Sequence, residues 1–296
     1  MNGWFSNASV AGPQSPPKPA ARMPATVADL VGLLELERVD DLILRGAAPE
    51  TTLQRVFGGQ VLAQALMAGG SSVHDHRHPH SLHGYFLRPG DPAIPIVYVV
   101  ENTRDGRSFS TRRIVARQHG ETIFHMTASF QVHEDGLDHQ DPMPLVPEPE
   151  TLPRLSDRPR ASDAVQRGEW DALEVRYDDA SDRGDEKLRV WLRTSGPMPD
   201  DPLLHAAVLA YASDLTLLAS VALRHDIRFG DPGVAAASLD HAMWFHRPVR
   251  VDEWLLHDQE SPSASGGRGL GRGRIFTRDG RLVATTVQEG LVRLQR

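Results

Sequence analysis

An internal repeat constrains the fold of this chain more than any other feature of the sequence. "SLHGYFLRPG", which begins at Ser81, resembles "SLDHAMWFHRPV", which begins at Ser238. "RRIVAR" and "ASFQ" of the first half resemble "GRIFTR" and "TTVQ" of the second half. The matches lie about 160 residues apart throughout, which indicates a duplication of one structural unit.

Each copy of the unit combines a helix with several strands. "RVFGGQVLAQALMAGG" at 55–70 predicts a helix that is entered at Gly58 and left at Gly70. Alternating apolar runs between 81 and 131 predict four strands, and His119–Gly120 is a hairpin signal between the last two. We therefore expect an α+β fold in which each unit is an antiparallel sheet wrapped around a central helix.

Composition predicts four segments. Residues 1–25 are rich in Pro, Ala and Ser and lack the apolar core of a signal peptide, so we expect a disordered tail, with Met23 as an alternative start. The first folded unit is expected at 26–140 and the second at 166–296. Between them, 141–165 is rich in proline and charge, as linkers are.

Net charge, apolar content and cysteine content exclude several classes of protein. A net charge of -7 and a pI near 6.0 argue against a nucleic-acid or membrane-surface partner. No apolar stretch approaches the ~20 residues of a membrane span, so we expect no membrane insertion. The absence of cysteine excludes disulfides, thiolate metal sites and a cysteine nucleophile. We expect a cytoplasmic protein.

One carboxylate stands out in an apolar environment. "PDDPLLHAAVLAYASDLTLLASVAL" at 199–223 predicts one helix, with Asp200 or Asp201 as N-cap and Pro202 at its first position. The helix is apolar nearly all round, so it should be buried. Burying an ionised Asp214 in the middle of this helix costs free energy unless a specific hydrogen bond stabilises the carboxylate. It is either a structural residue that bonds nearby backbone or a buried general base.

Two other patterns look catalytic but are better explained structurally. The five histidines between His74 and His83 have no standard metal-site spacing, so we expect no metal. Asp240 and His241 are adjacent in a predicted strand, where neighbours point to opposite faces, so we interpret them as structural residues. The same alternation predicts that Ser238 shares a face with Asp240.

Several blocks together resemble the acyl-CoA thioesterase II family, whose fold is two tandem hotdog domains. They are "RVFGGQVLAQAL", "FLRPGD", "RDGRSFSTRR", "MTASFQ", "YASDL", "DHAMWFHRP" and "DGRLVATTVQEG", in that order between 33 and 293. The resemblance implies hydrolysis of fatty acyl-CoA to free fatty acid and CoA, without a metal or redox cofactor. It also implies a homo-oligomer, a dimer or tetramer of double-hotdog subunits.

The resemblance also implies a site. In that family an aspartate on the second central helix, a threonine on the following strand and a glutamine on the last strand hold a water molecule. The motifs place these roles on Asp214, Ser238 and Gln288. Serine replaces threonine here but keeps the hydroxyl. Asp214 would then be the general base for direct attack by water.

Two other groups of candidate site residues each allow two interpretations. Gly58, Gly59 and Gln60 open the first central helix, so they supply either oxyanion donors or space for tight packing. Arg268, Arg272 and Arg274 alternate on one strand face and meet either coenzyme A phosphates or, as we favour, solvent.

Two other functions are compatible with such a chain. It could be an acyl-CoA-binding sensor without turnover, or a hotdog enoyl-CoA hydratase. A hydratase pairs an aspartate with a histidine, and no histidine lies within one helical turn of Asp214.

Overall fold

The computed structural model describes residues 21–74, 76–157, 168–178, 186–225, 227, 229 and 231–294. Of the predicted disordered tail, residues 1–20 lie outside these ranges. The prediction is wrong for the end of the tail, because Ala21–Arg22 form strand β1 and pair in parallel with β4, Pro49–Glu50. Met23 follows and is buried, so its apolar side chain anchors this end to the fold.

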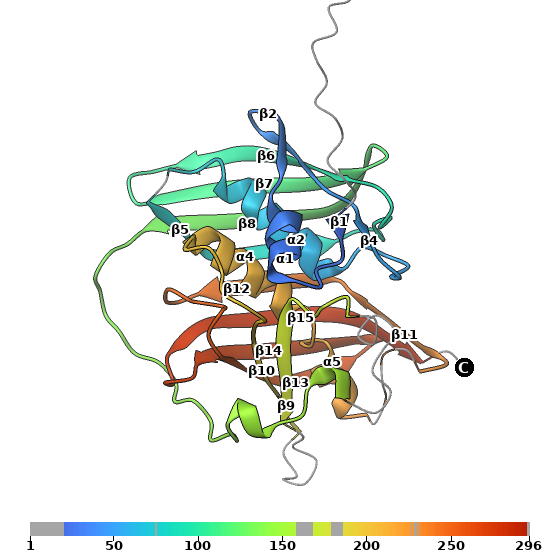
Figure 1. The fold of residues 1–296 in the computed structure, drawn as a ribbon. Coiled ribbons are helices and arrows are strands. Elements are labelled where there is room, and N and C mark those ends of the chain that lie inside the picture. Colours follow the sequence, from blue (N-terminus) through green and yellow to red (C-terminus); the bar gives the residue numbers. More distant parts are fainter. Residues whose placement is uncertain are drawn as a thin grey trace, which may run out of the picture.

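A 13-stranded sheet, antiparallel throughout, dominates the described chain (Figure 1). The first half contributes, from edge to centre, β2 (Glu37–Asp40), β3 (Ile43–Gly46), β6 (Ile96–Asp105), β7 (Phe109–Gln118), β8 (Glu121–Val132) and β5 (Arg77–Phe86). The second half continues with β12 (Asp240–Phe245), β15 (Leu282–Leu294), β14 (Arg268–Thr277), β13 (Leu255–Ser265), β10 (Leu188–Thr194) and β9 (Leu173–Asp178). β11 (Val234–Ser238) also pairs with β15. The second order mirrors the first, as the internal repeat predicts.

The two halves meet where β5 pairs with β12. His83 lies opposite Ala242 and Leu82 opposite Met243, so the backbone hydrogen bonds run across the junction. The largest buried apolar cluster contains side chains of both halves. The duplicated units therefore share one sheet and one core.

The hairpin predicted at His119–Gly120 is confirmed, and the second half contains an equivalent turn. His119 and Gly120 join β7 to β8 with φ of 49° and 79°. Gly280, with φ of 90°, lies in the turn between β14 and β15. Positive φ is the conformation that two-residue turns require, and glycine adopts it without strain.

Two long helices lie against each other inside the curve of the sheet (Figure 1). They are α2 (Gly58–Gly70), whose bounds agree with the prediction, and α4 (Pro202–Ser213). α1 (Val27–Leu34) covers both, and its N-cap residue Thr26 forms a capping box with Asp29. Two 3-10 turns, η1 (Pro149–Thr151) and η2 (Leu155–Asp157), follow the first half.

The predicted single helix over 199–223 is wrong, because it is interrupted at Asp214. Its start is confirmed: Asp201 caps α4 by accepting from Leu203 N (2.9 Å). α4 ends at Ser213, a turn follows, and a short helix, α5 (Ala219–Leu223), completes the segment. In this turn the backbone N–H of Leu215 bonds Ala212 O, three residues earlier (3.2 Å), and the hydroxyl of Thr216 donates to Gln259 of β13 (3.1 Å).

Glycines on β14 allow this segment to approach the sheet. An added Cβ at Gly269 would lie 2.2 Å from a methyl of Val221 in α5. One at Gly271 would lie 2.8 Å from the backbone oxygen of Leu217. Gly269 and Gly271 of "GGRGLGRGR" therefore allow close packing of this segment against β14.

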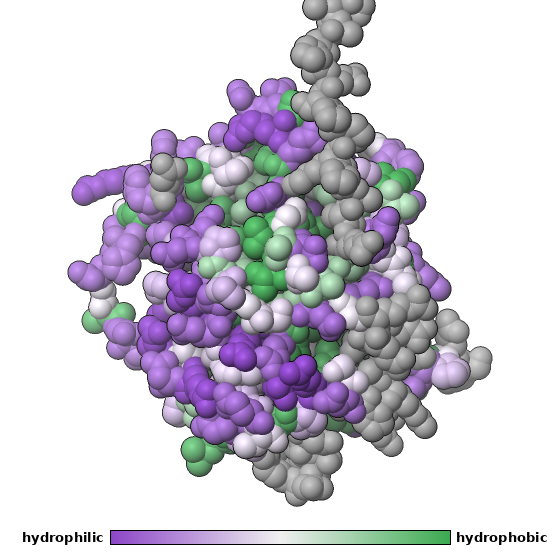
Figure 2. Space-filling model, in the orientation of Figure 1, coloured by the Kyte–Doolittle hydropathy of each residue, from purple (hydrophilic) through white to green (hydrophobic). Residues whose placement is uncertain are grey.

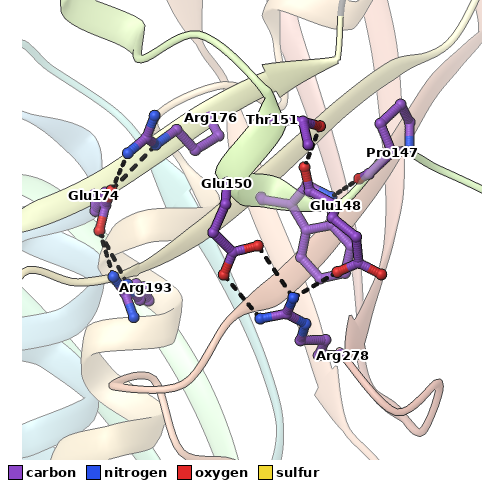
Figure 3. Close-up of polar contacts among 9 residues, drawn as sticks. Pro147, Glu148, Glu150, Thr151, Glu174, Arg176, Arg193 and Arg278 are labelled. Carbon is purple, nitrogen blue, oxygen red and sulfur yellow. Dashed lines mark hydrogen bonds and ion pairs between the residues drawn. The ribbon is translucent and has the colours of Figure 1, made fainter.

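The Pro-rich segment is attached to the outside of the second half (Figure 3). Arg278 on the β14–β15 turn forms ion pairs with Glu148 (2.6 Å) and Glu150 (2.9 Å). Trp191 on β10 donates from Nε1 to the backbone oxygen of Pro147 (3.0 Å). The described part of the predicted linker, up to residue 157, therefore follows the sheet surface, whereas 158–165 lie outside the described residues.

The surface seen from the helix side is divided by polarity (Figure 2). Hydrophobic residues are visible mainly around α1 and α2 in the centre, whereas hydrophilic residues gather at the lower left of the view. None of the described helices is long and apolar enough to cross a membrane.

Candidate active site

Three polar side chains from different elements meet where α4 ends. Gln288 on β15 donates from Nε2 to Asp214 Oδ1 (2.6 Å) and to Ser238 Oγ on β11 (2.9 Å). Gln288 is fully buried, and the Asp214 side chain is 5% exposed. The structure thus brings together the three residues that the sequence motifs single out.

These bonds leave two polar groups available. A carboxylate only accepts hydrogen bonds, so Gln288 must point its amino group at Asp214. Its carbonyl oxygen Oε1 is then buried without a hydrogen-bond partner among the described residues. The Ser238 oxygen accepts from Gln288, which leaves the hydroxyl hydrogen free to donate. A free acceptor and a free donor beside a carboxylate suit a water molecule.

Ser238 reaches this cluster because of a β-bulge. Ser238 pairs with Gly290, and Ala242 pairs with Val287, so the β11–β12 side contains one more residue than β15 over this stretch. The extra residue inverts the alternation of side chains. The prediction that Ser238 shares a face with Asp240 is therefore wrong: Ser238 points into the site and Asp240 points outward.

The N-terminus of α2 lies beside the carboxylate. An added Cβ at Gly58 would lie 2.7 Å from Asp214 Oδ2, so nothing but glycine fits between them. No side chain of the described residues caps this helix. Of the three predicted oxyanion donors, the backbone N–H of Gln60 is already bonded to Phe57 O (3.1 Å). The first-turn N–H groups of Gly58 and Gly59 have no intrahelical acceptor.

Gly59 also sets the distance between the two central helices. An added Cβ would lie 2.4 Å from the backbone oxygen of Tyr211 on α4, whereas Gly32 on α1 has nothing within 4 Å. We expect Gly59→Ala to lower the free energy of unfolding by about 1–3 kcal/mol, because the backbones must separate. Gly32→Ala is the matched control and should raise it by about 0.5–1 kcal/mol. Urea unfolding measures both, and equal stability of the two variants would contradict the tight crossing.

A histidine that sequence analysis assigned only a structural role also lies at this site. His241 on β12 is fully buried, and its Nδ1 is 3.7 Å from Asp214 Oδ1. Its Nε2 is 3.0 Å from Ser213 Oγ. As predicted, His241 and Asp240 point to opposite faces. No sequence pattern predicts that His241 lies near Asp214, because this contact depends on the bulge between β11 and β12 and on the place where α4 ends.

The arginines of β14 are paired with carboxylates. Arg268 bonds Glu289 (2.9 Å), and Arg272 bonds Glu260 (2.6 Å). Arg274 bonds Asp258 from Nη2 (2.7 Å). This arrangement favours the solvated strand face over a phosphate site. A groove of about 620 Å³ lies among these ion pairs, on the side of the sheet away from Gln288.

The histidines near β5 are not grouped around a common point. His80 contacts Ser129 (2.8 Å), and His83 contacts Asp240 (3.1 Å). Among the residues that the structure describes, no three His, Asp or Glu side chains are grouped to hold a metal ion.

Comparisons with known proteins place both halves in one family. A family model described as "Acyl-CoA thioesterase" matches residues 161–291, and one described as "Acyl-CoA thioesterase N-terminal domain" matches 47–131. Acyl-CoA thioesterase 2 of Haemophilus influenzae is 41% identical over 279 residues, which are 90% of this chain and 97% of the relative.

Solved structures agree with this assignment. The crystal structure of acyl-CoA thioesterase II TesB2 from Mycobacterium marinum matches with a TM-score of 0.78 and 47% identity, over 90% of this chain and 98% of that one. A protein from Alicyclobacillus acidocaldarius described as having a hot dog fold matches with a TM-score of 0.74 at 22% identity, over 90% and 98%. The predicted α+β double-hotdog fold is confirmed, and the chain belongs to the acyl-CoA thioesterase II family.

Proposed function

We propose that this chain hydrolyses fatty acyl-CoA thioesters to free acid and CoA, with Asp214 as the general base for an attacking water. Family membership supports the reaction class. The observation that carries the residue roles is the double donation by Gln288 Nε2, which holds Asp214 and Ser238 at one point. This point lies beside the uncapped N-terminus of α2.

The three side chains complement the hydrogen bonds of one water molecule. Asp214 accepts one of its hydrogens, and Gln288 Oε1, which has no other partner in the described chain, accepts the second. The free hydroxyl hydrogen of Ser238 is donated to one lone pair of the water oxygen. The other lone pair is left to attack the thioester carbonyl.

The reaction is balanced without any further reagent. The water oxygen bonds to the carbonyl carbon while one of its protons passes to Asp214. The negative charge on the carbonyl oxygen is stabilised by the N–H groups of Gly58 and Gly59, which the α2 dipole reinforces. Collapse of the tetrahedral intermediate breaks the carbon–sulfur bond, and the CoA thiolate takes the proton from Asp214. No covalent enzyme intermediate forms, and no metal or cofactor takes part in a step.

The hydratase alternative gains a histidine but not the required geometry. His241 lies close to Asp214, yet its side chain is fully buried. A hydratase needs both groups to reach the substrate. The sensor alternative gives no reason for a water-sized set of free donors and acceptors next to a carboxylate. Hydrolysis is therefore the function that the geometry supports best.

Release of free thiol from a series of saturated acyl-CoAs, beside the matching 2-enoyl-CoAs, tests this proposal. We expect thiol release from the saturated series, and the series also gives the chain-length preference. Hydration of the enoyl-CoAs without thiol release would establish the hydratase instead. Binding of the ligands without either reaction would establish the sensor.

We further propose that the chain acts in the cytoplasm as a homo-oligomer. Support comes from the outer face of the two central strands, where Tyr85 is 45% and Trp244 is 43% exposed. Large aromatic side chains that are exposed together are common at subunit contacts. Sedimentation equilibrium should give a multiple of the 32.6 kDa chain mass, and a monomer at micromolar concentration would contradict this.

A further inference from the structure

The hydrogens around His241 can be assigned from its neighbours. Ser213 Oγ is 2.9 Å from the backbone oxygen of Ala210 and 3.0 Å from His241 Nε2. The hydroxyl has one hydrogen, so it donates either to the carbonyl or to the ring. On its other side the ring presents Nδ1, which is buried without a hydrogen-bond partner among the described residues, to Asp214 Oδ1 at 3.7 Å.

An ionised Asp214 determines which ring nitrogen carries a hydrogen. A bare Nδ1 would direct its lone pair at the carboxylate, and two acceptors facing each other in a dry site repel. A hydrogen on Nδ1 removes this repulsion, and Ser213 can then turn its own hydrogen toward Nε2. The distance of 3.7 Å exceeds a hydrogen bond, but catalytic hydrogen bonds often tighten only when substrate is bound.

We propose that His241 is a positioning residue for the general base: its Nδ1–H is directed at Asp214 Oδ1, and Ser213 maintains this tautomer through Nε2. The inference rests on the proposed function. His241 does not touch the substrate. It favours the ionised carboxylate and leaves Oδ2, the oxygen beside Gly58, to take the proton from water.

Two other titratable groups near this pair, His257 and Tyr211, do not change their charge at ordinary pH. Burial, with a smaller contribution from His241, lowers the pKa of His257 on β13 to about 3. His257 therefore stays uncharged above that pH. Burial raises the pKa of Tyr211 on α4, which lies one turn before Asp214, so it keeps its proton. Glu169 is held by hydrogen bonds from Thr52, outside this contact.

The pH dependence of kcat tests the role of His241. A donor to a carboxylate lowers its pKa, so removing the donor raises it. His241→Leu should move the acid limb of kcat to higher pH by about one unit and lower kcat about ten-fold, with KM unchanged. His241→Asn keeps an amide N–H near the place of Nδ1 and should restore the wild-type limb.

Ser213→Ala provides a second variant with a matched control. It should move the acid limb of kcat to higher pH by less than His241→Leu does, because the His241 ring loses the partner that selects its tautomer. Ser220 is an equally buried serine that bonds a backbone oxygen three residues earlier, Leu217 O at 2.7 Å. Ser220→Ala should leave the limb in place. Loss of stability with unmoved limbs in His241→Leu and Ser213→Ala would overturn the proposal.

Nuclear magnetic resonance of protein labelled with ¹⁵N-histidine tests the tautomer without turnover. Wild type should show a slowly exchanging ring N–H on Nδ1 of His241, which shifts in Asp214→Asn. A hydrogen on Nε2 alone would overturn the proposal, even if the enzyme is active. If wild type releases no thiol, the proposed function fails, and the tautomer measurement alone decides whether the contact with Asp214 exists.

Discussion

Asp214→Asn is expected to lower kcat for acyl-CoA hydrolysis by about 10²–10⁴-fold, the usual contribution of a general base. Asparagine keeps the shape of the side chain, and its Oδ1 can still accept from Gln288, so the fold should survive. The amide cannot take a proton from water at ordinary pH. Thiol release from one good acyl-CoA substrate measures the loss, and circular dichroism checks the fold.

Asp240→Asn is the matched control for this substitution. Asp240 is the first residue of β12 and accepts from Glu289 N (2.7 Å), but its side chain points to the outer face of the sheet. Its substitution should leave kcat within a few-fold of wild type, since it reaches neither the water nor the substrate. If Asp214→Asn retains more than about a tenth of the wild-type rate, the general-base role is wrong.

Arg112 is the buried charge whose loss should cost the most stability. It lies on β7, is 1% exposed, and donates to Ser72 Oγ (2.8 Å), to Ser72 O (3.0 Å) and to Asp105 (2.8 Å). The hydroxyl of Ser110, followed by the guanidinium of Arg112, holds the pKa of Asp105 below its usual value. The guanidinium therefore joins the segment after α2 to two strands.

Arg112→Met should lower the free energy of unfolding by about 3 kcal/mol, because the half-buried Ser72 and the 43% exposed Asp105 lose the charged donor that holds them together. Arg113→Met is the control: its side chain is 54% exposed and forms a surface ion pair with Glu101 at 3.3 Å. That substitution should change stability by less than about 1 kcal/mol. Urea unfolding compares the two variants. Similar losses of unfolding free energy in the two variants would show that the hydrogen bonds of Arg112 do not stabilise the fold more than a surface ion pair does.

The two halves differ after their central helices. β7 occupies the same place in the first half as β14 does in the second. After α2 the chain carries Ser72, which accepts from Arg112 of β7 (2.8 Å). After α4 it carries Asp214, and glycines on β14 leave room for the segment that follows.

Local patterns in the sequence were sufficient for the duplicated plan and for many of its elements. The repeat predicted two units of one plan, and the mirrored strand order agrees with it. Glycine pairs predicted the ends of α2, and His119–Gly120 predicted a hairpin, because these features depend on backbone conformations that few residues adopt. The motifs that carry Asp214, Ser238 and Gln288 were also recognisable in sequence, since the resemblance covers most of the chain.

Tertiary structure decided how those residues meet. The break of the helix at Asp214 depends on glycines of β14 far along the chain, which allow the segment after it to pack on the sheet. The bulge between Ser238 and Ala242 is a mismatch between two strands, so it does not exist in either strand alone. His241 comes within 3.7 Å of Asp214 only because both features occur together. Sequence determined many of the elements through local conformational preference, whereas the site depends on packing between distant segments.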